Sequence, residues 1–128
     1  MGSGTGEEIR FEPLGVVANV SAWNYPYFVG ANVFLPALLT GNVVLYKPSE
    51  FALLTGANIT RLLHQAGIPD NVFQMITGDG VIGSQLLEQS IDGAFFTGSF
   101  VTGKKIAQQL AGRMIKVQLE LGGKDPAY

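Results

Sequence analysis

Cysteine is absent from all 128 residues of the chain. Disulfides, zinc–thiolate sites and a cysteine nucleophile are therefore excluded within these residues. Charge is also scarce, because charged residues make up 14% of the chain, against roughly 25% in an average soluble domain. So little polar surface suggests that most strands are buried on both faces, or that the chain is a piece of a larger protein whose partner surface is missing.

Basic clusters and long apolar runs are missing as well. A net charge of −2 and an isoelectric point near 5.2 give no sign of the basic surface that binds nucleic acid. No apolar stretch reaches the roughly 18 uninterrupted residues that a membrane-spanning helix needs, and no signal peptide is recognisable. We therefore expect a cytoplasmic protein with no nucleic-acid partner, no membrane partner and no metal site.

The sequence does contain short apolar runs that alternate with helical patterns. This alternation predicts βαβ units, and hence an α/β fold with an open parallel sheet of about five strands and helices on both faces. We expect residues 1–10 to be a leader or flexible end and residues 11–128 to form one domain. The predicted strands are 15–20, 42–47, 72–76, 93–97 and 116–120, and the predicted helices are 27–39, 53–66, 82–88 and 101–111.

The second predicted helix carries apolar residues at helical spacing. Its expected buried face consists of Leu54, Ala57, Leu62 and Ala66. The single histidine, His64, lies on the same helix with no carboxylate or thiol motif nearby, so we expect it at the surface or at the boundary of the core.

Each unusual stretch of the sequence follows a predicted strand. In chain order these stretches are SAWNYP, KPSE, TGDGVIG, TGSFVTG and LGGKDP. In an open parallel sheet, ligands bind beyond the carboxyl ends of the strands, where the loops leave room and helix N-termini present amide groups. We therefore expect one shared site along this edge of the sheet.

The stretch TGDGVIG contains the pattern G-x-G-x-x-G at Gly78, Gly80 and Gly83. Such a pattern between a strand and a helix suits phosphate binding, but it normally follows the first strand of its unit and here it follows the third. A glycine-rich turn with Asp79 as a cap is the alternative.

The stretch TGSFVTG is the stronger candidate for binding a phosphate. Gly98 would let the backbone approach a phosphate, and Ser99 would both cap the following helix and supply a hydroxyl donor. Gly103 would let that helix pack closely. A plain helix cap, with glycines needed only for packing, is the alternative.

The stretch KPSE places Lys47 and Glu50 at the end of the second strand. An ammonium and a carboxylate together suit the hydroxyl groups of a ribose, since one donates and the other accepts. A solvated ion pair is the alternative.

Taken together, WNYP, KPSE, FTGS followed by Gly103, and ELGGKDP resemble the aldehyde dehydrogenase superfamily in their order and separations. The resemblance covers residues 11–128, and LELGGK is its most specific motif. It implies a nonstandard Rossmann-like fold and the oxidation of an aldehyde to a carboxylic acid, with hydride transfer to NAD or NADP. In that family a cysteine thiolate attacks the carbonyl, and a glutamate activates the water that hydrolyses the thioester.

The resemblance also implies roles for individual residues. Asn24 would stabilise the oxyanion through its neutral side-chain amide, and Glu120, at a partly apolar strand end, would be the general base. Ser99 would bind the pyrophosphate, while Trp23 would mainly pack and fix the loop that carries Asn24. The full set of expected cofactor-binding residues is Ser21, Ala22, Trp23, Lys47, Ser49, Glu50, Gly78, Gly80, Gly83, Phe96, Thr97, Gly98, Ser99, Thr102, Leu121 and Gly122.

The resemblance also implies which part of the cofactor some of these residues would contact. Lys47 and Glu50 would hold the adenosine ribose, Gly78 and Gly80 would border the adenine, and Leu121 and Gly122 would lie near the nicotinamide. The G-x-G-x-x-G pattern would thus lie near the phosphates without binding them directly. Glu50 favours NAD, because a carboxylate repels a 2′-phosphate, whereas Lys47 would tolerate NADP.

Two departures from the family pattern limit what this chain can do. Where many members carry Trp-Lys, this chain has Asn32 and Val33, which indicates a different branch. The nucleophilic cysteine lies downstream of ELGGK in the family, so we expect a truncated NAD(P)-binding domain that ends at the start of the catalytic domain. Such a chain would bind cofactor without turnover and would self-associate or domain-swap through the uncovered surface. The alternative is a folding or self-association module with no useful cofactor affinity.

Overall fold

A computed structural model describes residues 6–123. The first half of the predicted leader, residues 1–5, lies outside the described residues. So do Lys124 and Asp125 of the LGGKDP stretch. Residues 6–14 have no regular secondary structure and lead into the first strand.

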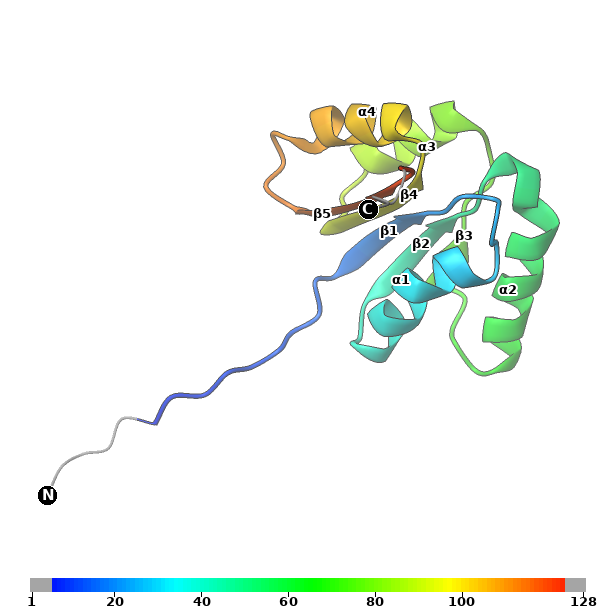
Figure 1. Ribbon diagram of the computed structural model, residues 1–128. Coiled ribbons are helices and arrows are strands. Elements are labelled where there is room, and N and C mark those ends of the chain that lie inside the picture. The colour runs from blue at the N-terminus through cyan, green and yellow to red at the C-terminus, as the bar shows by residue number, and fades with distance from the viewer. Residues whose placement is uncertain (1–5, 124–128) are drawn as a thin grey trace, which may run out of the picture.

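The fold is a five-stranded, wholly parallel sheet with the strand order β3-β2-β1-β4-β5 (Figure 1). The expected α/β class, the number of strands and the helices on both faces are therefore confirmed. The elements in chain order are β1 (Val16–Val20), α1 (Phe28–Leu39), β2 (Val43–Lys47), the short 3-10 helix η1 (Glu50–Ala52), α2 (Leu53–Gln65), β3 (Phe73–Met75), α3 (Gly80–Glu88), β4 (Gly93–Gly98), α4 (Phe100–Leu110) and β5 (Lys116–Leu121).

Two apolar layers hold the sheet between its helices (Figure 1). The layer under α3 and α4 contains Ala18 of β1 and Ala94 of β4, packed against Leu86 and Ile106 of these helices. The layer under α1 and α2 is aromatic, since Phe34, Tyr46 and Phe73 pack edge to face or tilted, with ring centroids 5.2 to 5.6 Å apart. Side chains alternate across a strand, so Val16, Ala18 and Val20 of β1 enter the layer under α3 and α4, while Val17 and Asn19 lie on the side of α1.

The turn into β1 needs glycine at position 15. Gly15 has a φ of +122°, and a Cβ added there would lie 2.2 Å from Oδ2 of Asp92. That carboxylate oxygen accepts a hydrogen bond of 2.8 Å from the Val16 amide, and Oδ1 of Asn42 accepts one of 3.0 Å from the Gly15 amide. The amino ends of β1, β2 and β4 are thus tied together at the edge opposite the predicted site.

Most predicted elements differ from the observed ones by one or two residues. The third strand is shorter than expected, Phe73–Met75 rather than 72–76, although Ile76 N still donates to Tyr46 O over 2.8 Å. The third helix begins at Gly80 rather than at Ile82, because the Asp79 carboxylate accepts hydrogen bonds from the Val81 and Ile82 amides and caps the first turn.

The predicted buried face of α2 is wrong. Leu54 is 89% exposed and Leu62 is also exposed, whereas Gly56 and Ile59 are buried. The reason is the close approach of α2 to the sheet, since a Cβ on Gly56 would lie 2.6 Å from Cγ of Pro48. Only a residue without a side chain fits there, so the helix turns its Gly56 side inward.

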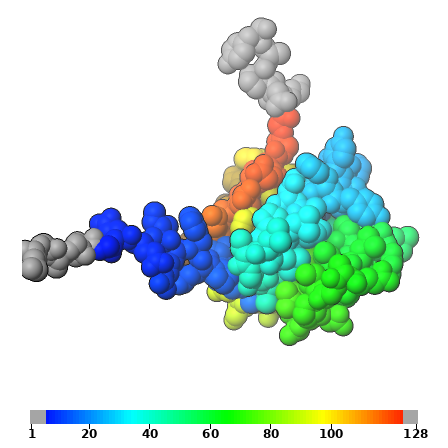
Figure 2. Space-filling view, turned by 90° about the horizontal axis from the view of Figure 1, so that it is seen from below, coloured from blue at the N-terminus to red at the C-terminus, as the bar shows by residue number. Residues whose placement is uncertain are grey.

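The expectation of strands covered on both faces holds for β1 but not for the edge strands. Gln74 of β3 is exposed, and so are Lys116, Gln118 and Glu120 of β5. Figure 2 shows the orange surface of β5 beside the cyan surface of α1. None of the helices within residues 6–123 is long and apolar enough to cross a membrane.

Candidate functional site

A cavity of about 450 Å³ opens at the carboxyl edge of the sheet, between the loops after β1, β2 and β4 and the helices α3 and α4. It brings together all the predicted cofactor-binding residues except Gly78, Leu121 and Gly122. The predicted residues that line it are Ser21, Ala22, Trp23, Lys47, Ser49, Glu50, Gly80, Gly83, Phe96, Thr97, Gly98, Ser99 and Thr102. Four of the five stretches thus contribute residues to one cavity, as a shared site requires.

Lys47 is the most unusual residue in this cavity. Its side chain is only 3% exposed, and its stem passes Gly83, where an added Cβ would lie 3.4 Å from Cε of the lysine. Burial lowers the pKa of Lys47, more than the nearby carboxylates of Glu50 and Asp79 raise it. Among the described residues, its ammonium makes one long hydrogen bond, 3.4 Å to Pro48 O. An ammonium has three donors, so two have no acceptor among the described residues, and Lys47 lines the cavity.

The alternative of a solvated Lys47–Glu50 ion pair does not hold. Lys47 is buried, and within residues 6–123 its ammonium lies more than 4 Å from the carboxylate oxygens of Glu50. Glu50 is exposed and accepts a hydrogen bond of 3.3 Å from the Ser49 hydroxyl. The carboxylate therefore remains available at the mouth of the cavity.

Ser99 caps α4, as the sequence predicts. Its hydroxyl oxygen accepts a hydrogen bond of 3.2 Å from the Thr102 amide and donates one of 3.0 Å to the Thr102 hydroxyl. Gly103 does allow close packing, because an added Cβ would lie 2.4 Å from Cδ2 of Leu121. Gly98 is also held tightly, with the Phe96 ring 2.5 Å from the position of its Cβ. The helix cap and the tightly packed glycines of the alternative are therefore both present, and the first turn of α4 also lines the cavity.

The three glycines of GDGVIG separate into different roles. Gly78 has a φ of +144° and an added Cβ would lie 2.4 Å from Cγ1 of Ile82, so the turn itself requires glycine there. Gly80 and Gly83 line the cavity, and Asp79 caps α3. The alternative of a capped glycine-rich turn is therefore confirmed for Gly78.

The sequence reasoning missed part of the cavity wall. Ser84 of α3 and Gln109 of α4 join the two helices, because the Ser84 hydroxyl donates to Gln109 Oε1 over 3.1 Å and Gln109 Nε2 donates to Ser84 O over 2.9 Å. The missed residues of α4 follow Thr102 by three, four and seven positions, so they lie on the same face of the helix. Helical spacing could therefore have predicted them. The residues missed are Val20, Phe51, Ser84, Leu87, Lys105, Ile106 and Gln109.

Of two smaller expectations, the one for Trp23 fails and the one for His64 holds. Trp23 is not a packing residue, because it is 61% exposed and forms part of the cavity rim. His64 does have a carboxylate nearby, since Nδ1 lies 3.3 Å from Oδ1 of Asp70, while Nε2 lies 3.0 Å from Phe73 O. The half-buried imidazole thus links α2 to the chain entering β3, which agrees with a boundary position.

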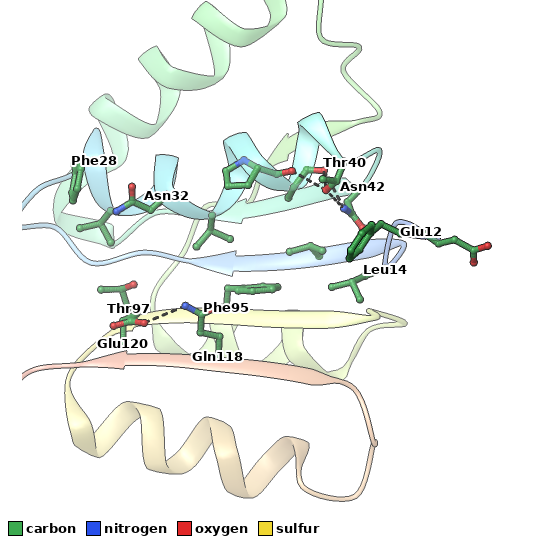
Figure 3. Close-up of a pocket in the computed structure, with 16 residues that line it drawn as sticks. Glu12, Leu14, Phe28, Asn32, Thr40, Asn42, Phe95, Thr97, Gln118 and Glu120 are labelled. Atoms are coloured by element: carbon green, nitrogen blue, oxygen red, sulfur yellow. Dashed lines mark hydrogen bonds between the residues drawn. The ribbon is translucent and has the colours of Figure 1, made fainter. Parts of the chain in front are cut away.

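A second cavity, of about 750 Å³, lies on the other side of the sheet, between α1 and the strands β1, β4 and β5. Figure 3 shows Phe28, Asn32, Thr97 and Glu120 at one end of it. Thr97 also borders the first cavity, so the two cavities approach each other at the end of β4.

The two predicted catalytic residues do not share a cavity. Glu120 lines the second cavity, where it is exposed and accepts a hydrogen bond of 3.1 Å from Gln118 Nε2 (Figure 3). Apolar side chains such as Phe28 and Phe95 line the same cavity, as expected for this carboxylate, although Glu120 itself is exposed. Asn24 is exposed on the loop after β1 and lines neither cavity.

The remaining predicted residues lie at the end of β5. Leu121 turns its side chain into the apolar layer under α4, and Gly122 donates its amide to Gly98 O over 3.3 Å. They therefore support the loop that carries Ser99 rather than lining the cavity. No cluster of three metal-ligating side chains occurs in the part of the chain that the structure describes.

The family model that matches this chain is described as "Aldehyde dehydrogenase family", and the match runs over residues 2–128. A 4,4'-diapolycopene aldehyde oxidase from a Methylomonas species is 44% identical over 117 residues, which are 91% of this chain and 22% of that protein. A betaine aldehyde dehydrogenase from Vibrio vulnificus is 42% identical over 118 residues, 91% of this chain and 24% of that protein. The chain thus spans less than a quarter of the length of these relatives.

Solved structures give the same result. An NAD-dependent aldehyde dehydrogenase from Sinorhizobium meliloti superimposes with a TM-score of 0.85 at 39% identity, covering 90% of this chain and 23% of that one. A betaine aldehyde dehydrogenase from Staphylococcus aureus, determined in complex with NAD+, has the same TM-score at 37% identity, covering 90% of this chain and 24% of that one. The family model matches residues 2–128 and these solved structures superimpose on about 90% of the chain, so the chain belongs to the aldehyde dehydrogenase family.

Proposed function

We propose that this chain is the dinucleotide-binding part of an NAD(P)-dependent aldehyde dehydrogenase. The parent enzyme would oxidise an aldehyde to a carboxylic acid. The bound NAD or NADP would supply the hydride acceptor for that oxidation. The chain contains no cysteine, so without a thiolate from elsewhere it would bind the cofactor but not catalyse the reaction.

The observation that carries this proposal is the buried Lys47 ammonium. Removing an ammonium from water is costly unless acceptors replace the water, and the described protein offers only one acceptor, at 3.4 Å. Ribose hydroxyl or phosphate oxygens in the cavity would supply the missing acceptors. The lowered pKa of Lys47 marks the unmet need for them, because burial disfavours the charged form.

The rest of the cavity suits the remainder of a dinucleotide. The Ser99 hydroxyl and the first amides of α4 would bind the pyrophosphate, since a helix N-terminus favours negative charge. Glu50 would accept hydrogen bonds from the ribose hydroxyls and would disfavour the 2′-phosphate of NADP. We therefore propose NAD as the preferred cofactor, with NADP as a weaker ligand.

The two catalytic roles remain part of the proposal. Asn24 would donate its side-chain amide to the oxyanion formed from the aldehyde, and Glu120 would take a proton from the hydrolytic water. Glu120 lies in the second cavity beside Phe28 and Thr97, so we place the aldehyde on that side of β4. Thr97, which borders both cavities, would then lie close to the boundary between substrate and cofactor.

Calorimetric titration of this chain with NAD and with NADP tests the proposal. We expect NAD to bind, and Lys47→Met to weaken its binding by about tenfold or more. The matched control is Lys104→Met, which removes an exposed lysine of α4 that does not line the cavity. Lys47→Met should also raise the melting temperature, because methionine does not incur the desolvation of a buried ammonium.

Two further variants address the phosphate and ribose roles. Ser99→Ala should lower the affinity for both cofactors by several fold. Glu50→Gln should lower the affinity for NAD and reduce the ratio of NAD affinity to NADP affinity. If neither cofactor binds and the variants behave like the unmodified chain, the cofactor site is wrong. The chain would then be a folding or self-association module, while its family membership would stand.

A further inference from the structure

A buried polar cluster lies between the sheet and the start of α1. Asn19, on β1, is 1% exposed, and Ser21 just beyond the strand is also buried. Nδ2 of Asn19 donates a hydrogen bond of 2.9 Å to Gly30 O of α1, while its Oδ1 accepts one of 3.1 Å from the Ser21 hydroxyl. The Ser21 amide in turn donates to Lys47 O over 3.0 Å, which continues the pairing of β1 with β2.

The fold does not require polar side chains at these positions. Position 19 is the only polar residue of β1, in a layer that otherwise consists of aromatic and aliphatic side chains. Burying an amide and a hydroxyl there is tolerated only because each is hydrogen-bonded, and apolar residues at both positions together would leave the layer about as stable. The role of the cluster therefore depends on which parts of the chain its hydrogen bonds connect.

Those bonds reach both ends of one loop. Residues 21–27 connect β1 to α1, and the cluster fixes the loop at Ser21 and at the first turn of the helix, through Gly30. The attachment is close, because a Cβ on Gly30 would lie 3.1 Å from the Ser21 hydroxyl oxygen and 2.9 Å from Cε2 of Tyr46. Ser21 and Trp23 of this loop line the first cavity, opposite Ser99.

We propose that Asn19 is a positioning residue, which sets the Ser21–Trp23 wall of the dinucleotide cavity and the place of Asn24 by tying β1 to the first turn of α1. This inference rests on the proposed function for its effect on NAD. Its effect on the loop itself is independent of any ligand.

The chain provides both a matched control and an internal probe. Asn42 is a second buried asparagine, which makes the same kind of side-chain bonds at the opposite end of the strands, 3.0 Å from the Gly15 amide and 3.0 Å to Ala37 O. Trp23 is the only tryptophan of the chain and lies on the loop in question. Its fluorescence anisotropy therefore reports how firmly the loop is held.

The experiment compares Asn19→Leu with Asn42→Leu by melting temperature, Trp23 anisotropy and NAD titration. We expect both variants to melt at lower temperature, because both lose buried hydrogen bonds. Only Asn19→Leu should lower the anisotropy of Trp23 and weaken NAD binding by about tenfold, while Asn42→Leu should bind NAD as the unmodified chain does. Ser21→Ala removes only the hydroxyl and should show the same two changes to a smaller extent, which tests the inference if Asn19→Leu does not fold.

Unchanged Trp23 anisotropy in folded Asn19→Leu, or in Ser21→Ala, would overturn the inference. Equal losses of anisotropy or NAD affinity in Asn42→Leu would do the same, since they would reflect general destabilisation. If the unmodified chain does not bind NAD but Asn19→Leu alone loosens Trp23, the proposed function fails while the positioning of the loop stands.

Discussion

At the scale of single residues, burial gives Tyr46 an unusual titration. Tyr46 is 1% exposed, and burial raises the pKa of its phenol to about 12, more than the nearby Ser21 hydroxyl lowers it. The neutral phenol is therefore favoured in the folded protein. Its contribution to stability is complete below pH 10, the ordinary pKa of tyrosine, and is lost as the pH rises from 10 to 12.

We accordingly expect Tyr46→Phe to flatten the alkaline loss of stability. At neutral pH the variant should change the free energy of unfolding by about 1 kcal/mol at most, since only the hydroxyl group is removed. Between pH 10 and 12 the unmodified chain should lose up to about 3 kcal/mol that the variant keeps. Urea unfolding at a series of pH values measures the difference, with Tyr25→Phe as the control at an exposed tyrosine. Parallel pH profiles for the unmodified chain and Tyr46→Phe would contradict the expectation.

At the scale of elements, Asp79 joins the cap of α3 to the charge of Lys47. Its carboxylate accepts a hydrogen bond of 2.9 Å from the Val81 amide, and its charge raises the pKa of Lys47 against the larger effect of burial. One side chain thus starts a helix on the chain after β3 and acts on a lysine at the end of β2.

The two effects of Asp79 can be separated by substitution. Asp79→Ala should destabilise the chain by about 1 kcal/mol, because the helix loses its cap, whereas Asp79→Asn should retain most of that stability as a neutral cap. Both variants should lower the pKa of Lys47 further. Chemical denaturation measures the first effect, and the NMR titration of the Lys47 side chain measures the second. Equal stability of the two variants would show that the cap contributes little.

Individual elements also show which structural features can be predicted from the local sequence. The caps Ser99 and Asp79 and the glycine at position 103 were predictable, because each acts on residues within one or two turns or on a neighbouring strand of known order. The face that α2 buries was not, since it depends on Gly56 meeting Pro48, a contact that only the packed structure defines.

At the scale of the whole molecule, the uneven cover of the sheet is the dominant feature. We call the surface formed by Phe95, Thr97, Gln118 and Glu120, on the α1 side of the last two strands, the β4–β5 face. It borders the second cavity together with Phe28, which is 66% exposed. Phe95 and Phe28 place aromatic side chains at this open face, and exposed apolar side chains favour association.

We expect copies of the chain to associate through the β4–β5 face. Sedimentation velocity over a broad concentration range should show a dimer whose proportion rises with concentration. Phe28→Gln should weaken the association by about tenfold, because it places an amide at the edge of the apolar contact. Leu54→Gln changes a still more exposed residue on α2, away from this face, and should leave the association unchanged. A monomer at every concentration would rule the interface out.

The candidate site was predictable in its location and less so in its contents. Parallel strands place their carboxyl ends together, so the motifs after β1, β2, β3 and β4 had to meet at one edge. Leu121 does not line the cavity because its side chain packs under α4 against Gly103, and Ser84 and Gln109 do line it, where they bond to each other between α3 and α4. These contacts join residues that are far apart in the sequence.

By itself, the sequence determined the alternation of strands and helices, the capped turn at Ser99 and the absence of a thiolate, since all three depend on neighbouring residues or on composition. The tertiary structure alone decided that Lys47 is buried and that Asn24 and Glu120 lie outside the shared cavity. The physical reason is that burial arises from residues of separate elements meeting in space. Gly83 of α3 leaves the room that the stem of Lys47 occupies, and no pattern along the chain records that contact.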